Sequence, residues 1–356
     1  MKLKDDVVVL TGGGTIGHVM LNTLIAPELL NDNVKPYYIG SKTGIEKEII
    51  EKSGIEYYSI SSGKLRRYLS FENIKDVFKV TKGIFDARRI LKKLQPKFVF
   101  SKGGFVSVPV VLAAKSLNIP VYIHESDISP GLANKIAGKF AKKIFVTFEK
   151  TLNFVDSNKS EYVGPVIREE LLHGSKEIAE NITGLDPNQP TIMFIGGSLG
   201  AKSINDLVHN HLDTFVDQYQ VIHITGPDNI REDISHPNYR QYEFVQHELA
   251  HFYKMSDVVI SRSGANVIYE LLLLKQPMLL IPLPLSQSRG DQIENAEYFK
   301  SKGYAETIED ESITPKRIID NIRKIENNKL EYIKNMETFT AGMTPKRLTE
   351  HLLKEE

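Results

Sequence analysis

Three glycine-rich segments of the chain each follow an apolar run directly. They are Thr11-Gly12-Gly13-Gly14-Thr15-Ile16-Gly17-His18, Ser101-Lys102-Gly103-Gly104-Phe105-Val106-Ser107 and Gly196-Gly197-Ser198-Leu199-Gly200-Ala201. Glycine has no Cβ and tolerates positive φ, so successive backbone N–H groups can converge on phosphate oxygens. A helix that begins behind such a loop adds a favourable dipole. A tight turn is the alternative for any one segment, but three together predict contact with a phosphate or a sugar.

These glycine segments do not match the two common nucleotide fingerprints. No Gly-Lys-Ser/Thr follows at the spacing of a P-loop. The second apolar run, residues 37–39, does not end in the acidic residue that NAD-binding folds place there. The glycines therefore indicate a phosphate site of another kind.

Two polar segments in the second half of the chain also follow apolar runs. Ser263-Gly264 is a good helix start, which places Glu270 about two turns into a helix. A carboxylate there can accept hydrogen bonds from both hydroxyls of a ribose, although an exposed helical glutamate without a partner is the commoner case. Residues 286–296 are dense in hydroxyl and amide groups, which suit sugar hydroxyls but are also ordinary in loops.

Short apolar runs alternate with segments of helical period along the whole chain. The runs are residues 7–10, 37–39, 97–100, 121–123, 144–146, 191–195, 221–224, 258–260 and 278–281. Uninterrupted apolar runs are typical of parallel strands buried on both faces, and their alternation with helices predicts doubly wound α/β sheets. Ligands bind beyond the carboxyl ends of the strands in such sheets.

The length of 356 residues exceeds the usual size of one domain. The polar segment 154–162 separates the first five apolar runs from the last four and is predicted to be a connection. We therefore predict two Rossmann-like domains, residues 1–163 and 164–335. A helix-prone tail, residues 336–356, can pack on either one.

Composition excludes several classes of protein. Forty-five basic residues balance 45 acidic ones, so the chain as a whole is not a polyanion binder and no nucleic-acid partner is expected. The absence of cysteine excludes disulfides, a cysteine nucleophile and thiolate metal sites. Residues 7–10 are too short for the apolar part of a secretory signal, and the apolar segment 271–285 is interrupted by three prolines. We expect a cytoplasmic protein.

Residues 63–97 combine basic and apolar side chains at helical period. The basic ones are Lys64, Arg66, Arg67, Lys75, Lys79, Lys82, Arg88, Arg89, Lys92, Lys93 and Lys97. Such a pattern suits binding in the plane of an anionic membrane, and a solvated helix packed on its own sheet is the alternative. Lys135, Lys139, Lys142 and Lys143 extend the basic patch.

Taken in order, the glycine and polar segments resemble those of the MurG family, the N-acetylglucosaminyltransferases of peptidoglycan synthesis. The resemblance also includes His124-Glu125-Ser126-Asp127, Gly131-Leu132-Ala133-Asn134-Lys135 and Gly290-Asp291-Gln292, and it covers nearly the whole chain. It implies a GT-B fold, in which two Rossmann-like doubly wound parallel-sheet domains face each other across a cleft. The acceptor is then expected on the N-terminal side and the UDP-sugar on the C-terminal side.

The resemblance also implies a reaction and its partners. The reaction is inverting transfer of GlcNAc from UDP-GlcNAc to the muramyl 4-hydroxyl of lipid I, undecaprenyl-pyrophosphoryl-MurNAc-pentapeptide, which yields lipid II and UDP. The implied partners are UDP-GlcNAc, lipid I, an anionic membrane surface and proteins of cell-wall synthesis, and no cofactor is implied. The implied location is peripheral, at the cytoplasmic face of the cell membrane.

Residues that match the family's motifs are expected to bind the substrates. They are Thr15, Gly17, Asp127, Asn134, Arg168, Ser198, Val245, Ala265, Glu270 and Gln292. Arg168 and Ser198 resemble pyrophosphate and nucleotide contacts, and Glu270 resembles the ribose ligand. The backbone at Val245 corresponds to the uracil contact, and Gln292 to an amide that holds GlcNAc hydroxyls.

Three positions depart from the residues common in the family. Ile16 replaces a glycine, which stiffens the first loop. Asp127 stands where many members have asparagine. Asp291 stands where many have glutamine, which leaves Gln292 to act alone.

An inverting displacement needs a base on the acceptor hydroxyl and stabilisation of the departing UDP. His18 is the first candidate for the base because free imidazole titrates near neutrality, and a histidine that only caps the first helix is the alternative. Glu125 is the second candidate, either as the base or as a residue that orients His18. The chain has no Asp-x-Asp motif, so no metal is expected and the third glycine loop with Arg168 takes its place.

Two other readings of the sequence stay open. One is another UDP-sugar enzyme of this fold, either a lipid glycosyltransferase or a UDP-GlcNAc 2-epimerase. The other is a non-catalytic scaffold that binds nucleotide sugars.

Overall fold

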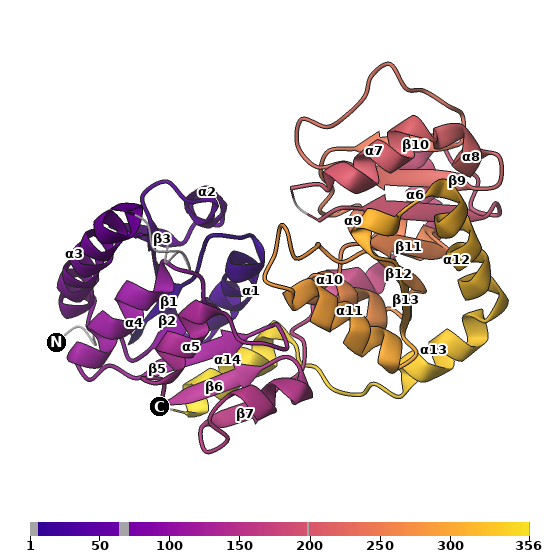
Figure 1. The fold of residues 1–356 in the computed structure, drawn as a ribbon. Coiled ribbons are helices and arrows are strands. Elements are labelled where there is room, and N and C mark those ends of the chain that lie inside the picture. The colour runs from indigo at the N-terminus through magenta and orange to yellow at the C-terminus, as the bar shows by residue number, and fades with distance from the viewer. Residues whose placement is uncertain (1–5, 64–70, 198, 356) are drawn as a thin grey trace. The chain divides into compact units, whose positions relative to one another are not determined.

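The structure is a computed structural model that describes residues 6–63, 71–197 and 199–355, with the backbone alone for residues 71–75 and 77. Lys64, Arg66, Arg67 and Ser198, which the sequence singles out, lie outside the described residues. The chain forms two compact units (Figure 1). The first contains Met1–Val166 and Ala341–Glu356, and the second contains Ile167–Thr340.

The first unit contains a seven-stranded parallel sheet in the order β3-β2-β1-β4-β5-β6-β7. Its elements are β1 Asp6–Thr11, α1 Gly17–Asn31, β2 Val34–Ser41, α2 Ile45–Lys52, β3 Glu56–Ile60, α3 Phe71–Leu94, β4 Val99–Ser101, α4 Ser107–Ser116, β5 Val121–Glu125, α5 Leu132–Gly138, β6 Lys143–Val146, η1 Glu149–Phe154, β7 Ser160–Tyr162 and α14 Pro345–Lys354.

Successive strand residues point to opposite faces of this first sheet, and helices cover both faces. Leu10 of β1 packs with α1 and α14 on one face, and its neighbour Val9 packs with α3 and α4 on the other. Full burial of such a side chain stabilises the fold by roughly 1.5–3 kcal/mol. Leu348 and Leu352 of α14 are fully buried in the first of these clusters. The C-terminal helix therefore completes the core of the N-terminal unit.

The second unit contains a six-stranded parallel sheet in the order β10-β9-β8-β11-β12-β13. Its elements are η2 Glu169–His173, α6 Lys176–Thr183, β8 Thr191–Ile195, α7 Lys202–Asn210, α8 Leu212–Val216, β9 Gln220–Ile224, β10 Tyr239–Tyr242, α9 Leu249–Met255, β11 Val258–Ser261, α10 Ala265–Leu273, β12 Met278–Leu280, α11 Asp291–Ser301, β13 Ala305–Thr307, η3 Asp310–Ser312, α12 Pro315–Asn327 and α13 Lys329–Glu337. The two parallel sheets confirm the predicted doubly wound α/β class.

All nine predicted strands are present, and four strands are not predicted by the apolar runs. The four are β3, β7, β10 and β13, and each lies at an edge of its sheet. Segment 154–162 is therefore wrongly predicted as a connection, because β7 lies within it and pairs with β6. The three residues of β7 are only half-buried because the strand lies at the edge of the sheet, so its sequence is not an apolar run.

The strand order brings distant loops together. In the first sheet β1, β4 and β5 are neighbours, so the loops that follow them lie together at the carboxyl ends of the strands. In the second sheet β8, β11 and β12 are arranged in the same way. These are the positions where doubly wound sheets bind ligands. Within the described parts of the chain, no helix is long and apolar enough to cross a bilayer.

Candidate active site

The first and second glycine loops touch each other in the first unit. Gly104 has a φ of +82°, and a Cβ at this position would collide with the backbone of Gly13. Side chains of β2 and α2 also form hydrogen bonds with the first loop. The hydroxyl of Tyr38 donates to the oxygen of Gly12 at 2.9 Å, and the N–H of Gly14 donates to Oε2 of Glu46 at 3.4 Å. The loop that carries His18 is therefore a packed, hydrogen-bonded structure.

His18 is the second residue of α1, and its ring bonds back to this loop. Nδ1 lies 3.1 Å from the carbonyl oxygen of Gly13 and 3.1 Å from Oγ1 of Thr15. A carbonyl oxygen only accepts hydrogen bonds, so in the neutral ring the proton belongs on Nδ1. This tautomer places the lone pair of the imidazole on Nε2, the atom that a general base needs.

Glu125, at the end of β5, is occupied by the loop that follows it. The side chain is 4% exposed. Oε1 accepts the N–H of Asp127 at 2.9 Å, while Oε2 accepts the N–H of Gly131 at 3.1 Å and Nδ2 of Asn134 at 2.9 Å. Three N–H donors hold this carboxylate in one orientation. Asp127 is half-buried in the same loop, and its backbone oxygen accepts the Thr151 hydroxyl at 3.1 Å.

A buried cation lies beside this carboxylate. Nζ of Lys102, in the second glycine loop, donates to Nδ1 of His124 at 2.9 Å, and both side chains are 2% exposed. Burial lowers the pKa of Lys102 to about 8, although Glu125 and Asp127 act in the opposite direction. Burial also holds the pKa of His124 well below its usual range, so the ring is neutral and accepts through Nδ1.

The second unit contains a cavity of about 540 Å³ beyond the ends of β8, β11 and β12. The lining residues come from three loops and the helices that follow them. They are Gly196, Gly197, Leu199, Gly200, Ala201, Lys202, Ser203, Asp206, Ser261, Arg262, Gly264, Val267, Leu283, Gln287 and Gln292. The third glycine loop and Gln292 thus lie at one cavity. Ala265 is buried directly after Gly264, at the first position of α10.

The amide of Gln292 is oriented by the backbone. The N–H of Leu283 donates to Oε1 of Gln292 at 3.1 Å, and the hydroxyl of Ser263 donates to the backbone oxygen of Gln292 at 2.8 Å. A backbone N–H can only donate, so it fixes which end of the amide is oxygen. The NH₂ group of Gln292 is therefore the end available to donate to a ligand.

Arg168 and Glu270, both expected to bind the donor, bind each other. Nε and Nη2 of Arg168 lie 3.0 and 2.9 Å from Oε1 of Glu270. Burial raises the pKa of Glu270, and the adjacent Arg168 acts in the opposite direction. Neither residue lines the 540 Å³ cavity, and neither does Val245, which is buried in the loop between β10 and α9. Of the described residues predicted to bind the donor, Gln292 thus lines the cavity, Arg168 and Glu270 form a separate ion pair, and Val245 and Ala265 belong to neither group.

Comparison with protein families decides the membership of the chain. The N-terminal domain of glycosyltransferase family 28 matches residues 8–146, and the C-terminal domain of the same family matches residues 191–352. The chain belongs to glycosyltransferase family 28. The two matched regions contain the loops described above, and Arg168 lies between them.

A curated relative covers almost the whole chain. It is the UDP-N-acetylglucosamine–N-acetylmuramyl-(pentapeptide) pyrophosphoryl-undecaprenol N-acetylglucosamine transferase of Staphylococcus aureus strain MRSA252. It is 51% identical over 350 residues, which are 98% of this chain and 98% of the relative. This identity confirms the resemblance to the MurG family.

Solved structures agree on the fold. The crystal structure of Acinetobacter baumannii MurG matches with a TM-score of 0.76 at 23% identity and covers 98% of this chain and 99% of that one. A UDP-GlcNAc 2-epimerase from Neisseria meningitidis, bound to UDP-GlcNAc, matches with a TM-score of 0.64 at 14% identity, over 98% and 99% of the two chains. At these identities the likeness shows the fold alone, which enzymes of different reaction types share.

The sequence does not reveal every residue that builds these loops. Glu46, Lys102 and Arg262 are buried, charged and directly hydrogen-bonded to loop residues or loop partners, yet none is a predicted site residue. Lys102 and Arg262 do lie inside the recognised motifs. Their signal in the sequence is a single charge between glycines or serines directly after an apolar run.

Proposed function

We propose that this chain transfers GlcNAc from UDP-GlcNAc to the muramyl 4-hydroxyl of undecaprenyl-pyrophosphoryl-MurNAc-pentapeptide and releases UDP. The observation that carries the proposal is the 51% identity, over 98% of both chains, to an enzyme named for this transfer. The oriented histidine in the first unit and the cavity with a glycine loop in the second unit supply the chemistry that such a reaction needs.

The donor is proposed to bind the second unit. The pyrophosphate suits the N–H groups of the third glycine loop and the start of α7, where the helix dipole favours an anion. Gln292 suits a sugar hydroxyl because its NH₂ group is left to donate. Glu270 suits the ribose hydroxyls, Arg168 the phosphates, and the backbone at Val245 the uracil. Ser198 and Ala265 complete the proposed donor site.

The acceptor is proposed to meet its base in the first unit, where Thr15, Gly17, Asp127 and Asn134 complete the proposed contacts. Inversion is a single displacement, so one group must take the proton from the acceptor hydroxyl as the bond to the anomeric carbon forms. The lone pair on Nε2 of His18 meets this requirement. Glu125 is the weaker candidate, because its oxygens already accept three N–H groups. We assign it the positioning of the loop that carries Asp127.

The lipid-linked acceptor is proposed to be reached at the cytoplasmic face of an anionic membrane, through α3. Phe78, Lys82, Phe85, Arg89 and Lys92 are all exposed and recur at intervals of three or four residues, so they form one stripe of the helix. Phe78 and Phe85 are 72% and 68% exposed. Aromatic side chains interleaved with cations on one face suit a headgroup layer.

One basic residue of this segment, Arg88, forms a hydrogen bond with α4 and is not part of the stripe. Nη1 of Arg88 donates to the backbone oxygen of Ser116, at the end of α4, at 2.9 Å. Arg88 therefore contributes to packing between α3 and α4, and we leave it out of the proposed membrane stripe.

The decisive experiment measures UDP release from UDP-GlcNAc with and without a lipid I analogue. We expect release only with the analogue, together with a disaccharide product. Turnover of UDP-GlcNAc without any acceptor would favour an epimerase. Binding of UDP-GlcNAc without UDP release for any acceptor would favour a scaffold.

A further inference from the structure

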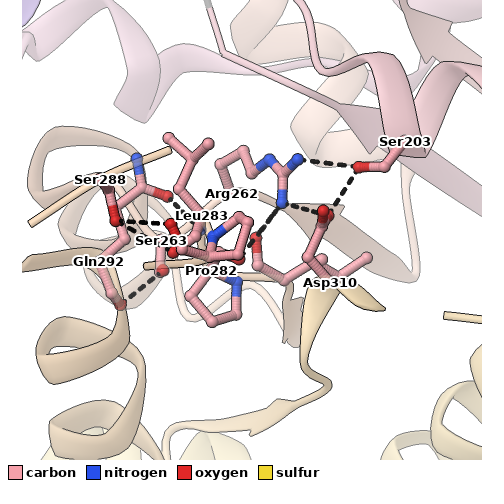
Figure 2. Close-up of polar contacts among 10 residues, drawn as sticks. Ser203, Arg262, Ser263, Pro282, Leu283, Ser288, Gln292 and Asp310 are labelled. Atoms are coloured by element: carbon pink, nitrogen blue, oxygen red, sulfur yellow. Dashed lines mark hydrogen bonds and ion pairs between the residues drawn. The ribbon is translucent and has the colours of Figure 1, made fainter. Parts of the chain in front are cut away.

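A buried arginine joins several parts of the lining of the 540 Å³ cavity. Arg262 directly follows β11, and its side chain is 8% exposed. Nη1 donates to the backbone oxygens of Ile281 and Pro282, at 3.1 and 3.3 Å, and to Oδ1 of Asp310 at 2.6 Å. Nη2 donates to Oγ of Ser203 at 2.9 Å. Figure 2 shows the guanidinium group between Ser203, Asp310 and Pro282.

The contacts of Arg262 form a closed ring with Ser203 and Asp310. The hydroxyl of Ser203 donates to Oδ1 of Asp310 at 2.6 Å, so its lone pairs are left to accept from Arg262. Asp310 is 9% exposed and supplies the negative charge that a buried guanidinium requires. Nη1, Nη2 and the hydroxyl of Ser203 each have an acceptor, and charge-assisted bonds of this kind are among the strongest in proteins. The guanidinium is therefore held in one orientation.

Three partners of Arg262, namely Ser203, Ile281 and Pro282, belong to two different segments of the chain at the cavity. Ser203 is the second residue of α7 and ends the segment 196–203, which begins with the third glycine loop. Ile281 and Pro282 begin the segment 281–292, and Leu283 in that segment orients the amide of Gln292. Arg262 itself lines the cavity together with both segments.

We propose that Arg262 is a positioning residue that sets the spacing between segment 196–203 and segment 281–292. The proposal rests on the proposed function for the identity of the ligand, in which the first segment holds pyrophosphate and the second holds the sugar. A planar guanidinium can bond to both segments at once, whereas a lysine ammonium has no such fork. UDP needs only the phosphate segment, but UDP-GlcNAc needs both in register. Loss of the fork therefore weakens UDP-GlcNAc binding more than UDP binding.

The test is the dissociation constants of UDP and UDP-GlcNAc, measured by calorimetry on the full chain with Arg262→Lys. We expect the affinity for UDP-GlcNAc to fall about tenfold more than the affinity for UDP, which corresponds to roughly 1.4 kcal/mol. A role in fold stability alone would leave the ratio of the two constants unchanged, and that result would overturn the proposal. Arg231→Lys is the matched control, because Arg231 makes an ion pair with Asp233 at 2.6 Å and is 52% exposed. It should leave both constants as they are.

A second variant covers the case in which Arg262→Lys does not fold. Asp310→Asn keeps an oxygen that can accept from Arg262 and removes only the charge, and Asp310 is not among the described residues of the lining. We expect the ratio of the dissociation constants of UDP-GlcNAc and UDP to change in the same direction but by less. An unchanged ratio would again overturn the proposal. Neither measurement contains an acceptor. If the unmodified chain did not transfer GlcNAc to any lipid, the proposed function would be wrong, but the binding result for Arg262 would still hold.

Discussion

Arg168 holds Glu270 through a single carboxylate oxygen. Nε and Nη2 of the arginine both bond to Oε1, and each side chain is 13% exposed. Within the described part of the chain, no group is hydrogen-bonded to Oε2 of Glu270. This geometry orients the carboxylate while one of its oxygens stays open to both hydroxyls of a ribose.

Replacement of Glu270 by alanine is therefore expected to weaken UDP-GlcNAc binding. Two hydrogen bonds to a charged group would be lost, each worth on the order of 1.5–3 kcal/mol. Calorimetry with UDP and UDP-GlcNAc measures the effect. Glu170→Ala is the control, because Glu170 lies 3.6 Å from the same arginine but is 50% exposed and screened by solvent. Unchanged affinity in Glu270→Ala would remove this residue from the donor site.

The affinity for UDP-GlcNAc is expected to fall as the pH is lowered. Burial raises the pKa of Glu270, so this carboxylate takes up its proton at a higher pH than a free glutamate. The protonated group loses both its ion pair with Arg168 and its strength as an acceptor. Each phosphate of UDP-GlcNAc carries one ester bond and the shared anhydride bond, so neither has a second proton and the ligand itself does not titrate in this range. Glu270→Gln should flatten the profile, and identical profiles for the two proteins would contradict the assignment.

His18→Ala is expected to lower kcat without a change in donor affinity. Loss of a general base reduces the rate by about 10²- to 10⁴-fold. Steady-state UDP release with a lipid I analogue measures kcat, and calorimetry measures the affinity. A variant with normal kcat would return His18 to the role of a residue that only supports the first glycine loop.

Glu125 is expected to act through folding rather than proton transfer. Glu125→Ala leaves three N–H donors without their acceptor, at about 1–3 kcal/mol for each buried group, so urea unfolding should shift to lower concentration. Glu125→Gln keeps one acceptor oxygen, which can serve two of the three N–H groups in place of Oε2, and should recover part of the stability and most of the turnover. If Glu125→Gln folds normally but has no turnover, Glu125 is the base instead.

Replacement of Lys82, Arg89 and Lys92 by glutamine is expected to release the protein from anionic vesicles. Each surface cation contributes about 1 kcal/mol to such binding, which weakens with salt as the Debye length falls to about 8 Å at physiological ionic strength. Lys300, Lys316 and Lys334, exposed in the second unit, are the control set. Turnover of a short-chain soluble acceptor should persist. Its collapse with intact vesicle binding would assign the stripe to the acceptor site or to the fold.

Transfer is expected to survive excess EDTA. Asp206 is the one carboxylate among the described residues that line the cavity of the second unit, and it is paired with Lys202. In the first unit, Glu161, His351 and Glu355 have the spacing of a metal site, but both carboxylates already bind the ammonium of Lys143. Loss of UDP release that Mg²⁺ restores would contradict this prediction.

The sequence alone predicts the class of fold and the loops that carry the chemistry. Apolar runs mark the strands that are buried on both faces, and glycines that need positive φ mark the loops after β1, β4 and β8. Both signals are local, because each depends on a few consecutive residues. The edge strands are not predicted because the signal for a strand is a local apolar run, and a half-exposed strand such as β7 does not have one.

Only the tertiary structure decides which side chains meet. Arg168 and Glu270 are 102 residues apart, and Arg262 and Asp310 are 48 apart, so no local pattern links them. The same holds for Glu125, whose oxygens are occupied only because the loop to Asn134 turns back over the end of β5. The position of a carboxylate in the sequence does not reveal what it accepts. Strand order and loop closure create those partners, and the partners determine which groups remain open to a substrate.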